Sequence, residues 1–222
     1  MKTNYKFNRW YHYIFGEKFY KRFDFEWHKY PSRYEIIQET IIRKNYKSYL
    51  EIGCDQDALF SKIAIDKKIG VDPLSGGTVR DTSDNFFKKN NTKFDVIFID
   101  GLHEYDQVKK DINNSLLFLN DNGVIFLHDC MPMCFIYQAT PRATTVWNGD
   151  VWKNIVESRT KSEIDTYVVH ADHGVGMILK RQNKKILNLN INNFKKLKFR
   201  DYFYNYKEYL NVVYKEDLRN IF

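Results

Sequence analysis

The sequence lacks several features that define specialised classes of protein. No apolar run is long enough to cross a bilayer, so we expect no membrane span. The first residues, MKTNYKFNRWYHYIFGEKFYKRF, lack a continuous apolar core and a small-residue cleavage site, which argues against a signal peptide. The three cysteines, Cys54, Cys130 and Cys134, form neither a disulfide framework nor a CxxC pair. We therefore expect a reducing, cytoplasmic setting.

The composition is that of a globular chain. Hydrophobic residues make up 43% and aromatic residues 17% of the 222 residues, which is enough for a sizeable core. We expect one domain over residues 1–222, with aromatic and basic extensions at 1–30 and 182–222. The net charge of +7 is compatible with an anionic partner, but a lysine-rich solvated surface explains it more simply. We expect the extensions to cover the core or a partner subunit, which leaves a homo-oligomer open.

Short apolar runs alternate with helical patterns, which predicts an α/β fold with a parallel sheet. The runs that predict buried strands are residues 48–52, 68–71, 94–99 and 123–127. Two further strands that flank an ADHG turn predict an antiparallel hairpin, at residues 166–170 and 175–180. Helices are expected over residues 31–44, 57–65, 104–119 and 150–158, with Pro31 in the first turn of the first helix.

Polar side chains and one glycine follow these strands at the point where each strand ends. They are Glu51, Gly53, Asp55, Asp57, Asp72, Asp100, His103, His128 and Asp129. Ligands of an open parallel sheet bind beyond the carboxyl ends of its strands, so we expect these groups to share a cleft.

The turn after the first strand, Gly53-Cys54-Asp55-Gln56-Asp57, lacks the second glycine of a dinucleotide-binding turn. Gly53 lets the backbone approach a ligand closely, but Asp55 and Asp57 would repel a pyrophosphate. Asp72 follows about twenty residues later, a separation typical of a carboxylate that binds ribose hydroxyls. A cofactor with a ribose, a positive charge and no phosphate therefore fits better, and S-adenosylmethionine (SAM) has these properties.

Seven segments of the chain together resemble a known family. They are YLEIGC, GVDP, TSDNFF, FDVIFIDGLHEYDQVKKDI, NGVIFLHDCMP, GDVWK and DHGVGMI, in this order. Over residues 34–180 the sequence resembles bacterial class I SAM-dependent methyltransferases of the small-molecule group called methyltransferase family 24. The resemblance implies a Rossmann-like fold, with a mostly parallel seven-stranded sheet, helices on both faces and a reversed final hairpin. Asp57 departs from the pattern, since many relatives have glycine there.

The resemblance also implies roles for individual residues. Glu51 and Gly53 would contact the methionine portion of SAM, and Asp72 would hold the ribose. The segment TSD would place Ser83 and Asp84 near the adenine. The segments IDGLH and LHD would place the remaining residues around the reactive sulfur and the acceptor: Asp100 and His103 under the sulfur, His128 and Asp129 on the acceptor side.

Two mechanisms remain open for these residues. Either His103 or His128 removes a proton from the acceptor as the methyl group is transferred, oriented by Asp129 or Asp100. Alternatively, Asp100 and Asp129 bind Mg²⁺ through their oxygen atoms. Trp147 and Trp152 are candidates either for the acceptor pocket or for the core.

The resemblance suggests O-methylation of a small-molecule acceptor, such as a sugar or another hydroxylated metabolite. A non-catalytic SAM-binding or assembly module on the same fold is the first alternative. A nucleic-acid methyltransferase is the second, but the sequence lacks an Asn/Asp-Pro-Pro-Tyr motif and its basic residues form no single block. We therefore expect no nucleic-acid partner.

Overall fold

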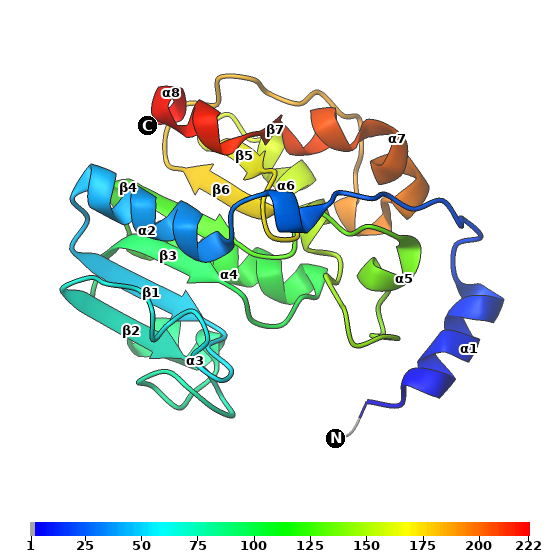
Figure 1. The fold of residues 1–222 in the computed structure, drawn as a ribbon, viewed down its shortest axis with the longest axis horizontal. Helices are drawn as coiled ribbons and strands as arrows, with labels where there is room; N and C mark the ends of the chain where they lie inside the picture. Colours follow the sequence, from blue (N-terminus) through cyan, green and yellow to red (C-terminus); the bar gives the residue numbers. More distant parts are fainter. Residues whose placement is uncertain (1–2) are drawn as a thin grey trace.

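Seven strands form one sheet in the computed structural model, which describes residues 3–222 (Figure 1). The strand order is β2-β1-β3-β4-β6-β5-β7. The bounds are β1 Ser48–Ile52, β2 Lys67–Val71, β3 Phe94–Ile99, β4 Leu119–Leu127, β5 Asp165–Val169, β6 Val175–Leu179 and β7 Val212–Val213. Strands β2, β1, β3 and β4 pair in parallel, whereas β6 runs antiparallel to both β4 and β5. The mostly parallel sheet with a reversed hairpin is thus confirmed.

Two strands differ from the sequence prediction. The resemblance implied seven strands, but no residue range was predicted for the seventh. This strand, β7, lies within the C-terminal extension and pairs in parallel with β5. Strand β4 begins at Leu119 instead of Gly123, because Leu119 pairs with Phe94 before an irregularity in the register. Residues 120–122, which lie between the predicted helix and the predicted strand, are therefore part of β4.

Helices cover both faces of the sheet (Figure 1). Their bounds are α1 Tyr5–Phe15, α2 Arg33–Lys44, α3 Ser83–Lys89, α4 Tyr105–Phe118, α5 Phe135–Gln138, α6 Val151–Arg159, α7 Phe199–Leu210 and α8 Leu218–Ile221. Short 3₁₀ helices occupy Trp27–Lys29, Phe194–Lys196 and Lys215–Asp217. No helix among residues 3–222 combines the length and apolar character that a membrane span requires.

The placement of Pro31 in the first helical turn was wrong. Helix α2 begins at Arg33, because Ser32 is its N-cap. The Ser32 side chain accepts a hydrogen bond from the Glu35 amide, and the Glu35 carboxylate accepts one from the Ser32 amide at 2.8 Å. This reciprocal pair satisfies amides that have no partner within the helix, and it fixes the start after Pro31.

The helix expected over residues 57–65 was also wrong. This segment forms consecutive turns instead. Asp55 and Asp57 have φ angles of +46° and +61°, in the left-handed region that an α-helix of L-residues does not propagate through. The Asp57 carboxylate accepts a hydrogen bond from the Gly77 amide at 2.6 Å, which ties this turn to the loop after β2. The left-handed backbone at Asp57 also explains why glycine suits this position in relatives.

Side chains alternate between two cores on opposite faces of the sheet, as the period of two in a strand requires. On one face, strand residues such as Leu50 and Ile97 pack with residues of α3, α4, α6 and α7. On the other face, residues such as Tyr49 and Phe98 pack with α2, the turns at residues 59–63 and α8. Both cores leave the carboxyl ends of the central strands open for a site.

Both extensions contribute to the first core, where Phe25 of the N-terminal extension is buried, but helix α1 does not. In the C-terminal extension, Phe199, Tyr202 and Leu210 of α7 are buried in the first core. In the N-terminal extension, His12 is the buried residue of α1, and this helix lies away from the sheet (Figure 1). The aromatic residues of the C-terminal extension thus cover the core, whereas those of α1 do not.

Candidate active site

A cleft of about 560 Å³ opens beyond the carboxyl ends of β1, β3 and β4. Its walls come from the loops after these strands, the start of α2, residues 142–147 and the β5–β6 turn. The lining includes seven of the residues that were expected to share a cleft: Glu51, Gly53, Asp55, Asp100, His103, His128 and Asp129. The structure therefore brings most of the predicted site residues together.

The β1 side of the cleft is formed by Glu51 and Gly53. Gly53 has a φ angle of +88°, and a Cβ atom there would lie 2.3 Å from the Asp100 carbonyl oxygen. Glycine is thus required by the contact between two loops, in addition to any contact with a ligand. The Glu51 carboxylate is almost fully buried and accepts a hydrogen bond from the Tyr49 hydroxyl. Burial outweighs this hydrogen bond and raises the pKa of Glu51 to about 7.

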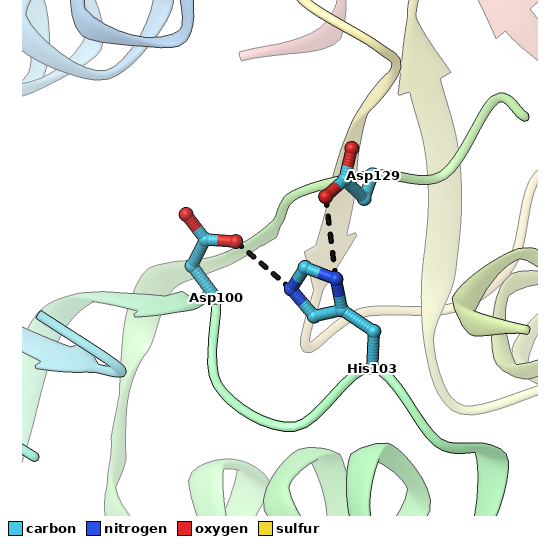
Figure 2. Close-up of side chains that lie close together, drawn as sticks. All are labelled: Asp100, His103 and Asp129. Atoms are coloured by element: carbon cyan, nitrogen blue, oxygen red, sulfur yellow. Dashed lines mark hydrogen bonds and ion pairs between the residues drawn. The ribbon is translucent and has the colours of Figure 1, made fainter. Parts of the chain in front are cut away.

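His103 lies between two carboxylates, one from the end of β3 and one from the end of β4 (Figure 2). Its Nε2 atom is 3.1 Å from Asp100 Oδ1, and its Nδ1 atom is 3.3 Å from Asp129 Oδ2. Nδ1 also lies 3.1 Å from the Trp147 carbonyl oxygen, which can only accept a hydrogen bond. Both ring nitrogens therefore face oxygen atoms that accept hydrogen bonds, which favours the doubly protonated ring. The Trp147 carbonyl holds the proton on Nδ1, and Nε2 is the nitrogen that faces Asp100.

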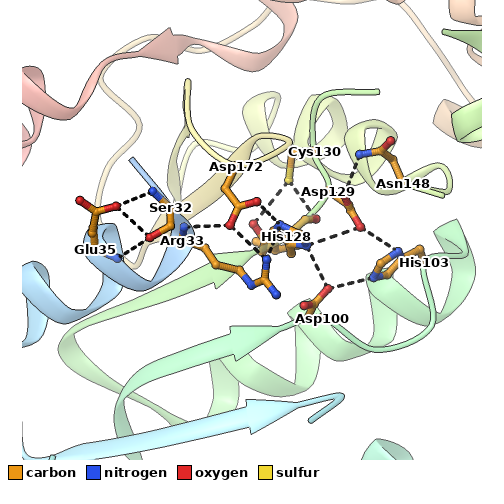
Figure 3. Close-up of polar contacts among 11 residues, drawn as sticks. Ser32, Arg33, Glu35, Asp100, His103, His128, Asp129, Cys130, Asn148 and Asp172 are labelled. Atoms are coloured by element: carbon orange, nitrogen blue, oxygen red, sulfur yellow. Dashed lines mark hydrogen bonds and ion pairs between the residues drawn. The ribbon is translucent and has the colours of Figure 1, made fainter. Parts of the chain in front are cut away.

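His128 lies deeper, among three carboxylates and a guanidinium (Figure 3). Its Nδ1 atom is 3.3 Å from Asp100 Oδ1 and 3.5 Å from Asp129 Oδ2. On its other side, Nε2 is 3.6 Å from Asp172 Oδ1, and Asp172 Oδ2 accepts a hydrogen bond from Arg33 Nη1 at 3.0 Å. Every nitrogen of the ring therefore faces at least one carboxylate.

The charges of this network shift the pKa values of its members. Burial disfavours the charged form of His128, but Asp100 and Asp129 outweigh it and hold the pKa well above its usual range. Burial also disfavours the charged form of His103, but the hydrogen bond with Asp100 outweighs burial and raises the pKa of His103. Burial favours neutral Asp100, but His128 and His103 hold its pKa well below the usual range. Without a bound cation, the site thus keeps its carboxylates ionised by protonating histidines.

The β5–β6 turn delivers Asp172 to this network. Asp172 and His173 have φ angles of +35° and +62°, and Gly174 has +88°. The turn is held against the end of β4 by hydrogen bonds from the Cys130 amide to the Gly174 carbonyl and from the Met131 amide to the His173 carbonyl. This strained turn therefore aims Asp172 at His128 and Arg33.

Residues 142–147 form the wall opposite β1. The Trp147 indole stacks on His103, with ring centroids 5.6 Å apart and an interplanar angle of 26°. The Arg142 guanidinium lies 5.5 Å from the Trp147 ring centroid. Asn148 donates a hydrogen bond to Asp129 Oδ1 at 2.7 Å, which fixes that carboxylate. Trp147 lines the cleft, whereas Trp152 is fully buried in the core, so the two tryptophans have different roles.

Three predicted cofactor residues lie outside the lining of the cleft. The Asp72 carboxylate accepts hydrogen bonds from the amides of Asp55, Leu74 and Ser75 at 3.0, 2.7 and 2.9 Å. Burial alone would raise the pKa of Asp72, but the hydrogen bonds from these amides outweigh burial and lower the pKa. Ser83 and Asp84 begin α3, where both accept hydrogen bonds from the Gln107 amide group. Asp72 thus joins the loops after β1 and β2, and its role toward a ligand stays a prediction.

Sequence reasoning missed Arg33, Arg142, Asn148 and Asp172. Arg33 and Asp172 are 139 positions apart, and Asn148 is 19 positions from Asp129. No short motif links residues at such separations. The left-handed backbone of the ADHG turn is the one local signal, because Asp and Gly tolerate it.

Three ligand atoms in this site could surround a metal ion. One atom each from Asp100, His103 and Asp129 lies within 4.8 Å of the other two. Two carboxylate oxygens suit Mg²⁺ or Mn²⁺, and an imidazole nitrogen suits Mn²⁺ better than Mg²⁺. The chemistry of these donors therefore fits a divalent cation, and Asp100 and Asp129 are the pair that the sequence indicated.

The comparisons with known proteins concern the family and the fold. Residues 24–130 match the sequence family described as a methyltransferase domain. The search of curated proteins found no match.

Among solved structures, the SAH-bound methyltransferase PaMTH1 from Podospora anserina is similar, with a TM-score of 0.52 and 18% identity, over 82% of this chain and 98% of that one. Cofactor-bound Rv0187 from MTB has a TM-score of 0.51 and 13% identity, over 68% of this chain and 80% of that one. A Klebsiella pneumoniae protein provisionally described as an O-methyltransferase has a TM-score of 0.50 and 11% identity, over 67% and 80%. At these identities, the similarity establishes a common fold.

Proposed function

From the premise that this chain is a class I SAM-dependent methyltransferase, we propose that it methylates a hydroxyl oxygen of a small, hydrophilic acceptor such as a sugar. The observation that carries the proposal is the cluster of Asp100, His103 and Asp129 in the same cleft as Glu51 and Gly53. One side of the cleft then serves the cofactor, and the other side serves the acceptor.

The cofactor side is supported by the acidic character of the β1 edge. Glu51 faces the cleft, and an ionised carboxylate there would attract the positive charges of SAM. We propose contacts from Asp72 to the ribose and from Ser83 and Asp84 to the adenine, as the family resemblance implies.

The acceptor side is supported by the wall that contains Trp147 and Arg142. An indole face provides an apolar platform for the C–H groups of a sugar ring. Arg142 uses Nε and Nη2 to donate to the carbonyl groups of Thr144 and Thr145, which leaves Nη1 for an acceptor. A hydroxylated methyl acceptor with an oxygen-rich substituent would pack on the Trp147 indole and accept a hydrogen bond from Arg142 Nη1.

His103 is the proposed general base. In the transfer, the acceptor oxygen attacks the methyl carbon, the carbon–sulfur bond breaks with its electron pair going to sulfur, and S-adenosylhomocysteine leaves. The hydroxyl proton would pass to Nε2 of His103 once this nitrogen has given up its own proton, because the Trp147 carbonyl holds the other proton on Nδ1. His128 is the less suitable base, because carboxylates face both of its ring nitrogens and hold its pKa well above the usual range.

A divalent cation would be held by Asp100 and Asp129, with His103 beside it. When bound, such an ion would supply positive charge that the histidines otherwise provide, and it would attract an acceptor oxygen. Asn148 and His128 would orient the two carboxylates, as outer partners of ligands do.

The test is methyl transfer from labelled SAM to a panel of hydroxylated acceptors, with chelator and with Mg²⁺ or Mn²⁺ restored. His103→Gln should lower turnover about 10²- to 10⁴-fold, the usual contribution of a general base, and leave SAM affinity unchanged. The matched controls are His28→Gln and Asp121→Asn, at two exposed positions outside the cleft. Wild-type turnover in His103→Gln would refute the base, and turnover that is insensitive to chelator would refute the metal.

A further inference from the structure

Polar side chains of helix α1 form hydrogen bonds with the loop at residues 141–142. Asn8 Nδ2 donates a hydrogen bond to the Arg142 carbonyl at 2.6 Å. His12 Nε2 lies 2.7 Å from the Pro141 carbonyl, and His12 is 7% exposed. Tyr5, Asn8 and His12 recur at the spacing of one helical face, so this polar face is the one that packs on the body of the protein.

The opposite face of α1 is apolar and exposed to solvent. Phe7, Trp10, Tyr11 and Ile14 each lie three or four residues from other members of this group, so they share this face. Their exposed fractions are 57%, 54%, 38% and 44%. Large side chains of a solvated helix normally face the core, and a contiguous apolar face of this kind marks an interaction surface. We call these four residues the α1 face.

Cations lie along one flank of the α1 face and beyond its C-terminal end, and none has an ion-pair partner among residues 3–222. Lys6 and Arg9 lie on the helix, and Lys18 and Lys21 follow it. None of the four forms an ion pair with a residue of 3–222. Glu17 is the acidic residue of this segment, and its carboxylate accepts hydrogen bonds from the Phe199 and Arg200 amides at the start of α7. The surface is thus aromatic at its centre and positive at its edge.

An apolar groove of about 310 Å³ adjoins the helix on the flank of Arg9 and Tyr13. Phe19, Phe135 and Ile136 contribute to its walls, and Lys18 and Lys21 lie at the same groove. The apolar surface around α1 therefore extends beyond the helix itself, and cations accompany it there too.

We propose that the α1 face docks on an anionic lipid surface. Aromatic side chains of an amphipathic helix enter the boundary between headgroups and acyl chains, while lysine and arginine pair with anionic headgroups. Charge complementarity decides between this occupant and a second copy of the chain. Two copies that met through the same face would bring identical cations together, which opposes a symmetric contact.

The apolar character of the face decides against nucleic acid as the occupant. Single strands bind where aromatic rings alternate with cations along a groove that follows the backbone. Here Ile14 lies at the centre of the face, and the cations are confined to its edges. This arrangement suits a surface with an apolar interior and charged headgroups.

The test is co-sedimentation of the full chain with vesicles of phosphatidylcholine alone and of phosphatidylcholine with phosphatidylglycerol, at low and high salt. Binding is expected to the anionic vesicles and to weaken as salt screens the charges. Trp10→Ser/Ile14→Ser should lower the partition coefficient about tenfold or more. Lys6→Gln/Arg9→Gln should lower it about 25-fold, since each cation near an anionic surface contributes about fivefold.

The matched control is Ile42→Ser/Leu117→Ser, which removes two exposed apolar side chains, 69% and 68% exposed, from α2 and α4. This control should bind like the wild type, and circular dichroism should show that all variants are folded. Absence of binding to anionic vesicles at low salt would overturn the proposal. So would equal binding by the α1 variants, or concentration-dependent dimerisation that Trp10→Ser/Ile14→Ser abolishes in the absence of vesicle binding. Preferential binding of single-stranded DNA over anionic vesicles would overturn it as well.

Discussion

Glu51 offers a sharp test of the cofactor side, because its environment makes both stability and binding depend on pH. Burial raises its pKa from an ordinary value of 4.5 to about 7. At about 1.4 kcal/mol per tenfold change in proton affinity, this difference corresponds to about 3 kcal/mol.

The sign follows from the order of the two titrations. Below pH 4.5, Glu51 is protonated in both the folded and the unfolded chain, so its titration does not alter the free energy of unfolding. Between pH 4.5 and 7 the unfolded chain ionises first, so the free energy of unfolding falls. Above pH 7 the loss is complete, at about 3 kcal/mol. Glu51→Gln should remove this loss, so the variant should be more stable than the wild type at pH 8 and nearly equal at pH 5.

The assay is denaturant unfolding of both proteins, without cofactor, at pH 5, 6, 7 and 8. Asp111→Asn is the matched control, because burial raises the pKa of Asp111 to about 6 and this residue lies on α4, outside the cleft. It should show the same kind of pH-dependent stabilisation. A stability difference between Glu51→Gln and the wild type that does not vary with pH would refute the reasoning.

The same residue should link SAM binding to proton release. If ionised Glu51 faces the positive charge of SAM, binding should strengthen as pH rises through about 7 and should release a proton. Calorimetry in buffers with different ionisation enthalpies measures that proton. Glu51→Gln should lose the pH dependence, whereas Asp111→Asn should keep it. If the wild type binds SAM with no proton release at pH 7, Glu51 does not face the cofactor.

Three further predictions concern the fold around the site. Gly53→Ala should destabilise the chain, because its Cβ atom would lie 2.3 Å from the Asp100 carbonyl; an unchanged melting temperature would contradict this contact. His128→Gln should be less stable than the wild type in chelator, and since the folded pKa of His128 is raised, the difference should be complete below pH 6.5 and shrink as pH rises through the folded pKa. A difference that grew with pH would contradict the assignment of His128 as a buried cation. Trp152→Ala should cost about 3–5 kcal/mol in unfolding experiments, as expected for a fully buried core side chain, and a cost under about 1 kcal/mol would place it outside the core.

The parallel core of the sheet and the polar groups at its edge could be predicted from the sequence alone. Apolar runs such as 48–52 and 94–99 can be buried on both faces only as central strands, so their positions were readable without tertiary information. Because parallel strands end at one edge, the polar residues after them had to converge. Asp100, His103 and Asp129 were therefore predictable as neighbours.

Which of these residues face the cleft, and which of them are charged, depends on tertiary contacts that the sequence pattern does not show. Asp172 and Arg33 surround His128 because a hairpin turn and a helix start meet there, and no local pattern encodes that meeting. The Asp72 carboxylate accepts hydrogen bonds from three backbone amides and is shielded from solvent, because the loops after β1 and β2 meet around it. The turns at residues 55–62 replaced a predicted helix, since left-handed backbone at Asp55 and Asp57 overrode local propensity. Contacts between distant segments carry this information, and they form only when the chain has folded.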